Sequence, residues 1–323
     1  MIIRMQWLAP LALAALLVPV RSFAQADFSG VWQPHYDEDN PERIPGPELR
    51  DYAGLPINEN ARQFADSWDP SRITLPEEQC RVHVSPYIYR GPMNLQVWEE
   101  RDPKTRELIA LKHYISTYEQ TRTIYMDGRP HPGPNAPHTW MGFSTGHNEG
   151  DMLVIETTHL KQGWVRRNGL PMSDQAHMTE YWVRNGDLAT QIVVLVDPVF
   201  LAAPLVKSQD FTRSARELAA QTWLWVCESV IEIPRDEGVV PAYMPGEHPF
   251  KEEYARRHGI PVAATDGGPE TMYPEYQKVL ATLPTPPPLP APARGGRAGG
   301  AGAGGGGGRQ GGAGNAGAPQ GGR

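Results

Sequence analysis

Short segments of alternating apolar and polar residues fill the chain from Tyr87 to about residue 230. They are rich in β-branched and aromatic side chains and are separated by turn signals such as Asp127-Gly128, a pattern typical of antiparallel strands. A first strand is expected at Gly30. The other predicted strands are residues 93–99, 108–116, 120–126, 139–147, 152–158, 177–183, 189–196, 206–212 and 222–230. So many strands exceed what a flat sheet holds comfortably, so the pattern predicts a mainly β fold, an antiparallel meander that closes into a barrel.

A few short helices are expected outside this barrel. Residues 58–68 predict a helix that Asn58 caps, and residues 249–258 predict another that ends at Gly259. Residues 274–283 predict a third helix, with proline in its first turn. The organisation predicted is a single β-rich domain at residues 27–284, with a long excursion at 33–86 and a C-terminal helical segment at 240–284.

Both ends of the chain differ from this body in composition. Residues 1–26 combine Arg4, an apolar run at residues 7–20 and a small-x-small site at 24–26, which indicates a signal peptide removed after Ala26. The apolar run is shorter than the about 20 residues that a membrane-spanning helix needs. Residues 285–323 are rich in proline and then in glycine and alanine, which predicts a disordered tail. We therefore expect a periplasmic or secreted protein with no membrane span.

The charge of the body argues against a nucleic-acid partner. The whole chain has a net charge of −7, and removing the two arginines of the signal and the four of the tail leaves −13 on residues 27–284. An acidic body of this kind repels phosphate backbones.

The chain has two cysteines, Cys80 and Cys227, and both lie in the expected exported part. An oxidising compartment favours a disulfide between them, whereas the alternative is a pair of buried thiols. Closing so long a loop would remove about 5 kcal/mol of unfolded-chain entropy. We expect the disulfide, and no catalytic role for either cysteine.

Three charged residues, Arg122, Glu156 and Glu180, alternate with apolar residues in predicted strands. Charges on apolar faces are costly unless they are paired. If those faces point into the barrel, Arg122 balances one or both carboxylates and the three form the polar part of a ligand site. The alternatives are an ordinary structural ion pair or faces that point outward. Trp140 and Trp182 are the expected apolar contacts of a ligand.

Three other patterns bear on catalysis or metal binding. His177 and Glu180 would form an acid and base pair only if their segment were helical or bulged, because in a regular strand they lie on opposite faces. Residues 142–146 match Gly-x-Ser-x-Gly, but Ser144 lies in a predicted strand and the strand-turn-helix elbow of serine hydrolases is not expected. The histidines between residues 113 and 177 lack a tight ligand spacing. No metal or other cofactor is therefore predicted, and a metal site is the alternative.

Two resemblances add to these interpretations. Gly30-Val31-Trp32 resembles the Gly-x-Trp signature of lipocalins, which set a basic residue of the last strand against the tryptophan, and Arg213 is the candidate here. More of the chain resembles a group of uncharacterised exported bacterial proteins of lipocalin-like (calycin-like) appearance. The shared segments are residues 27–32, 122–125, 127–132, 139–142, 149–151 and 226–228. This resemblance implies a small barrel and brings no known reaction.

The leading hypothesis is an exported barrel that binds a small, largely apolar molecule, with Arg122 and Glu156 or Glu180 as buried polar anchors. The second is an enzyme that uses the same cavity for acid and base chemistry, such as an isomerase, dehydratase or hydrolase. The third is an envelope structural or interaction protein in which the tail matters most.

Overall fold

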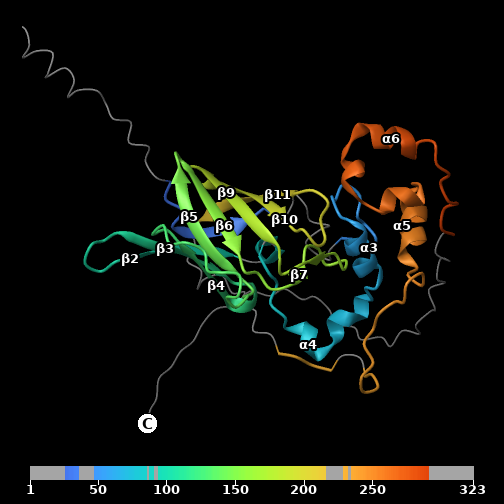
Figure 1. Ribbon diagram of the computed structural model, residues 1–323, viewed down its shortest axis with the longest axis horizontal. Helices are drawn as coiled ribbons and strands as arrows, with labels where there is room; N and C mark the ends of the chain where they lie inside the picture. Colours follow the sequence, from blue (N-terminus) through green and yellow to red (C-terminus); the bar gives the residue numbers. More distant parts are fainter. Residues whose placement is uncertain are drawn as a thin grey trace, which may run out of the picture. The chain divides into compact units, whose positions relative to one another are not determined.

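The computed structural model describes residues 26–35, 47–85, 87–90, 94–215, 228–231 and 234–290. Nine strands close into a barrel in the order β1-β11-β10-β9-β6-β5-β4-β3-β2 (Figure 1). The strands are β1 (Gly30–Pro34), β2 (Leu95–Arg101), β3 (Leu108–Ile115), β4 (Gln120–Tyr125), β5 (Phe143–Glu149), β6 (Met152–Thr158), β9 (His177–Asn185), β10 (Leu188–Val196) and β11 (Leu205–Ser214). The predicted mainly β barrel is confirmed.

One pair of neighbours departs from the predicted antiparallel meander. β4 and β5 pair in parallel, through Ile124 with Ser144 and Tyr125 with Thr145. A parallel pair needs a long connection, and residues 126–142 supply it, because the chain must return to the other end of the barrel before β5 begins. The strand predicted at 139–147 therefore starts only at Phe143.

Outside the barrel, β7 (Gly163–Trp164) and β8 (Pro171–Met172) form a small two-stranded sheet that the sequence pattern did not predict. The predicted strand at 222–230 lies largely outside the described residues, and residues 228–230 are not in a strand. The predicted signal peptide lies outside the described residues except for Ala26, and so does the tail from residue 291.

The excursion between β1 and β2 carries short helical turns. α3 (Glu59–Asp66) confirms the predicted helix, and the Asn58 side chain accepts a hydrogen bond from the backbone N–H of Ala61 as its N-cap. The other elements here are η1 (Pro70–Thr74), α4 (Pro76–Gln79) and η2 (Tyr87–Arg90), and η3 (Thr117–Glu119) follows β3. The residues of η2 matter most for the interior, because Tyr87, Ile88 and Tyr89 are all buried.

The C-terminal helical segment also forms as predicted. α5 (Phe250–His258) ends at Gly259, whose φ of +64° is the left-handed conformation that favours glycine, and α6 (Pro274–Leu280) begins with proline (Figure 1). The turns η5 (Val262–Thr265) and η6 (Pro269–Met272) lie between them. Among the helices of the described residues, none combines the length and apolar character needed to cross a membrane.

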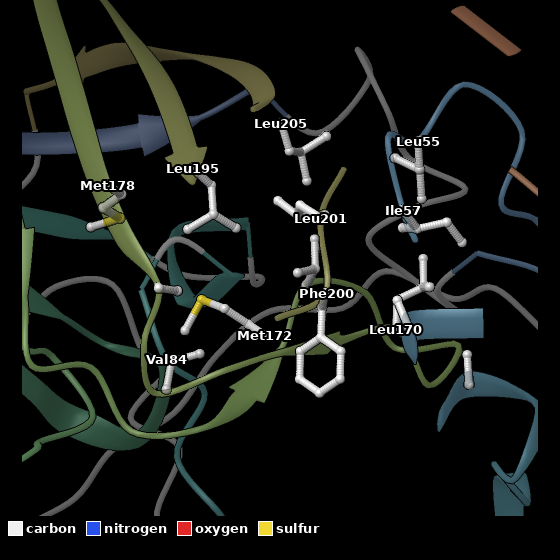
Figure 2. Packing of buried hydrophobic residues seen from close by; sticks show 14 of the residues in the cluster. Leu55, Ile57, Val84, Leu170, Met172, Met178, Leu195, Phe200, Leu201 and Leu205 are labelled. Carbon is white, nitrogen blue, oxygen red and sulfur yellow. The ribbon is translucent and has the colours of Figure 1, made fainter. Parts of the chain in front are cut away.

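Two apolar clusters fill the body. The end cluster joins the first residues of β9 and β11 and the last of β10 to the excursion and to the loops that follow β6 and β10, as Figure 2 shows for Leu55, Met172, Met178 and Leu195. The barrel cluster occupies the barrel interior. Its buried members are Phe28, Trp32, Ile88, Tyr89, Leu95, Val97, Leu111, Ile115, Ile124, Met141, Leu153, Ile155, Trp182, Ala189 and Phe211.

Candidate functional site

A layer of polar side chains lies inside the barrel between the two apolar clusters. On β9, Glu180 falls between Met178 of the end cluster and Trp182 of the barrel cluster. All members of this layer are buried, and we call them the interior polar layer: Tyr89, His113, Arg122, Ser144, Thr157, Glu180, Gln191 and Gln209. Seven strands and the η2 turn contribute to it, which explains why no local sequence motif marks it.

Arg122 and Glu180 form the charged centre of this layer. Arg122 is 1% exposed and Glu180 0%, and the guanidinium contacts both carboxylate oxygens, with Nη1 at 3.1 Å from Oε1. Arg122 also donates to the hydroxyls of Ser144, Tyr89 and Thr157, at 3.1, 3.1 and 2.7 Å. A guanidinium has five N–H donors, and these contacts use all five. Arg122 therefore has no N–H left for a ligand.

The carboxylate of Glu180 is similarly occupied. Its Oε1 accepts a second hydrogen bond, from the Gln191 side chain at 2.7 Å. Burial lowers the pKa of the Arg122 guanidinium, but its interactions with Glu180 and Tyr89 have a larger opposite effect. The pKa of the guanidinium is therefore raised above its ordinary value. The pair is an internally neutral brace, and removing one partner leaves the other charge uncompensated in the core.

Two neutral titratable groups adjoin this pair. Burial raises the pKa of the Tyr89 phenol to about 12, so the hydroxyl keeps its proton. Burial, and next the charge of Arg122, lower the pKa of His113 well below its ordinary value, so the imidazole is neutral at neutral pH. The Tyr89 hydroxyl and His113 Nδ1 are 3.0 Å apart.

The structure places three of the five predicted ligand-site residues inside the barrel, and two of them, Arg122 and Glu180, are in contact. Arg122, Glu180 and Trp182 all face the barrel interior. Trp140 is partly buried and packs against both clusters, with Lys161 Nζ 4.9 Å from its ring centre. Glu156 is exposed, so its predicted inward face is wrong: Leu153, Ile155 and Thr157 alternate as the inner residues of β6.

His177 and Glu180 are not brought together. Their segment is the regular strand β9, in which His177 is exposed and Glu180 is buried on the opposite face. The helical turn or bulge that an acid and base pair requires is not formed, and the two side chains cannot share a cavity.

The Gly-x-Ser-x-Gly pattern has a structural explanation. Ser144 lies within β5, fully buried, and shares hydrogen bonds with Arg122 and Thr157. Gly142 has a φ of +68°, and a Cβ there would lie 2.6 Å from the Thr158 carbonyl oxygen. A Cβ at Gly146 would lie 2.7 Å from a side-chain sulfur. The positive φ and the contact with a backbone oxygen therefore require glycine at position 142, whereas the contact at Gly146 is with the flexible Met126 side chain. No nucleophile elbow is formed.

The histidines of the connection after β4 lie on the outside of the barrel. His131 contacts the hydroxyls of Thr145 and Thr158, both at 2.8 Å, and His138 contacts the Leu160 carbonyl oxygen at 2.8 Å. These contacts hold the long connection against β5 and β6. Among the described residues, no group of three or more His, Cys, Asp or Glu side chains is arranged to hold a metal ion.

Sequence reasoning missed five members of the interior polar layer: Tyr89, His113, Thr157, Gln191 and Gln209. His113, Gln191 and Gln209 carried a usable signal, because each alternates with buried apolar residues of its strand. Tyr89 carried none, since it enters the barrel from the excursion through η2.

The tryptophan of the first strand has two arginines nearby. Arg213 pairs with Trp32 across β1 and β11, and its guanidinium lies against Gly30. The cation over the Trp32 ring is Arg184 of β9, at 5.6 Å from the ring centre. Trp32 Nε1 donates to the Phe28 carbonyl oxygen at 2.8 Å.

Cys227 lies outside the described residues, so the disulfide with Cys80 stays a prediction. The neighbours of both cysteines in the chain are in contact. Gln79 donates to the Val230 carbonyl oxygen at 2.6 Å and accepts from the Ser229 hydroxyl at 3.1 Å.

Comparison with family models, with curated proteins and with solved structures gave no significant match.

Proposed function

We propose that this chain is an exported binding protein whose barrel interior holds a small, largely apolar molecule. The observation that carries the proposal is an aromatic interior next to a neutralised polar layer. Trp182 stacks on Phe211 with ring centres 5.4 Å apart and meets Phe28 and Tyr89 edge-on at 6.1 Å each. Apolar and aromatic walls with a few placed polar groups are the usual lining of small-molecule sites.

Electrostatics favour a ligand without net charge. Arg122 and Glu180 compensate each other, and all five donors of the guanidinium are used. A charged ligand would have to break this pair or stay without a counterion in a low-dielectric interior, which is costly. A periplasmic or secreted location, and kinship with the exported lipocalin-like group, belong to the same proposal and are supported by the form of residues 1–26 and the shared segments.

The enzyme alternative receives less support. The pair proposed for acid and base chemistry, His177 and Glu180, lies on opposite faces of β9, and the Glu180 oxygens are held by Arg122 and Gln191.

The proposal is tested with a neutral apolar fluorophore, N-phenyl-1-naphthylamine, titrated into the mature chain. Ala189 of β10 is fully buried in the barrel cluster, so Ala189→Phe adds a large ring to the barrel interior. Ile192→Phe adds an aromatic ring to the opposite face of the same strand and is the matched control. We expect saturable binding to the parent chain and to Ile192→Phe, and at least a tenfold weaker affinity for Ala189→Phe.

Circular dichroism and thermal melts of each variant show whether the barrel is still folded. Equal affinity of the parent and a folded Ala189→Phe variant would place the fluorophore outside the barrel and overturn the proposal. Absence of saturable binding by the parent chain would also count against it.

A further inference from the structure

Three polar atoms inside the barrel have no hydrogen-bond partner among the described residues. They are His113 Nε2, Trp182 Nε1 and Gln209 Oε1, on side chains only 1%, 2% and 3% exposed. Buried polar atoms are nearly always paired, because desolvation without a partner is costly. Arg122, by contrast, uses all of its donors. The three unpaired atoms therefore indicate a bound molecule that supplies their hydrogen-bond partners.

The proton of His113 is assigned by its neighbour. The Tyr89 oxygen accepts a hydrogen bond from Arg122, which has no acceptor to offer in return. The single proton of the Tyr89 hydroxyl therefore points to its other neighbour, His113 Nδ1, at 3.0 Å. Nδ1 accepts, and the neutral ring carries its proton on Nε2. The free His113 atom is thus a hydrogen-bond donor.

The other two atoms have fixed roles as well. Trp182 Nε1 is a donor only. The Gln209 amide is oriented by its Nε2, which donates to the Tyr89 carbonyl oxygen at 2.6 Å, so its Oε1 is left as an acceptor. The interior therefore offers two donors and one acceptor.

The two donors belong to touching side chains, and the acceptor lies two strands away in the same cross-strand row. The rings of His113 and Trp182 are in edge-to-face contact, with centres 5.4 Å apart. Gln209 and Trp182 are cross-strand partners of the same residue, Gln191, and so lie in one row across β9, β10 and β11. Two donors on touching rings suit a carbonyl oxygen, and the acceptor in the same row suits a donor group of the same ligand.

We infer that His113 Nε2–H and Trp182 Nε1–H bind a carbonyl oxygen of a neutral apolar molecule. Gln209 Oε1 accepts from a hydroxyl or N–H group of the same molecule. This inference rests on the proposed function and names the chemistry of its ligand. It moves the polar anchor from Arg122 and Glu180, whose hydrogen bonds are already made, to atoms that are free.

The test compares two probes that differ in a carbonyl group, 2-acetylnaphthalene and 2-ethylnaphthalene. His113→Asn keeps an acceptor oxygen for the Tyr89 hydroxyl but lacks the Nε2–H donor, and Trp182→Phe lacks the indole donor. We expect each variant to bind the ketone about tenfold more weakly, the size typical of one hydrogen bond in a binding site, and the hydrocarbon with less than twofold change. His177→Asn, on the exposed face of β9, is the control and changes neither affinity.

A second measurement does not depend on any probe. The ¹⁵N spectrum of the histidine rings in the mature chain should show His113 neutral at pH 7 with its proton on Nε2. A proton on Nδ1, or equal losses of ketone and hydrocarbon affinity in a folded His113→Asn variant, overturns the inference. In that case saturable binding of both probes still supports the binding barrel, whereas binding of neither probe to the parent chain overturns the inference and the proposed function together.

Discussion

Replacing Arg122 by methionine removes the charge that neutralises Glu180 and all five hydrogen bonds of the guanidinium. Glu180 is 0% exposed, so its carboxylate would stay in the core without a counterion. Removing one partner of a buried pair costs about 3–5 kcal/mol. For a body of this size, each kcal/mol corresponds to about 2–4 °C of melting temperature. We therefore expect Arg122→Met to lower the melting temperature by roughly 6–20 °C.

The second variant of this experiment is the double replacement Arg122→Met with Glu180→Leu. It removes both charges, and replacing a buried pair by apolar groups is far less costly than breaking it. The reasoning predicts that adding Glu180→Leu restores part of the stability lost in Arg122→Met. Urea unfolding followed by tryptophan fluorescence measures each free energy of unfolding. Arg129→Met, which removes an exposed arginine paired with Asp127, is the control and should leave the unfolding midpoint unchanged.

Two results would refute this reasoning. A loss of less than about 1 kcal/mol in Arg122→Met would mean that the pair does not brace the core. A double variant less stable than Arg122→Met would mean that Glu180 is stabilised by its other contacts, such as the one with Gln191, rather than by the charge of Arg122.

Three more predictions test the packing, the titration and the covalent structure. Gly142→Ala should destabilise the barrel by at least about 2 kcal/mol more than Gly150→Ala, because both have a similar positive φ but only Gly142 is in close contact with its neighbours; paired urea unfolding measures the difference. Because the pKa of His113 is lowered in the folded chain, only the unfolded chain binds a proton at this histidine just below pH about 6.5, and stability falls as the pH decreases. His113→Asn should therefore reduce the dependence of the unfolding free energy on pH between pH 6 and 5 by up to about 1.4 kcal/mol per pH unit, as measured by urea unfolding at several pH values. If Cys80 and Cys227 are bridged, the denatured intact mass shows a deficit of two hydrogens that reductant removes, and Cys227→Ser lowers stability by about 2–5 kcal/mol; a full-hydrogen mass contradicts the bridge.

Periodicity predicted the strands well where one face is buried and the other is not. β3 forms within one residue of its predicted bounds, because its buried residues Leu111, His113 and Ile115 alternate with less buried positions. It failed for Glu156, since Val154 is buried on the outer side of β6 and an apolar neighbour there does not mark the inner face. Local pattern also could not reveal the parallel pairing of β4 with β5, which depends on the path of the connecting segment.

The candidate site was predictable only in part, for a related reason. Arg122 and Glu180 are recognisable as charges on apolar strand faces, and the structure places them in contact. That their hydrogen bonds are all satisfied depends on three hydroxyls and the Gln191 amide, which come from four other segments, among them η2 with Tyr89. No spacing rule in the sequence predicts that a turn of the excursion places Tyr89 at the centre of the barrel. The unpaired donors of His113 and Trp182 can therefore be identified only in the folded structure.

The most direct measurement is native mass spectrometry of the mature protein purified from its own compartment, beside its denatured intact mass. We expect a non-covalent mass increment from a small neutral organic molecule that contains oxygen, lost on denaturation and reduced in His113→Asn. An increment the size of a metal ion, or an apo mass in a protein that also binds neither naphthalene probe, would contradict a barrel that holds a neutral organic ligand.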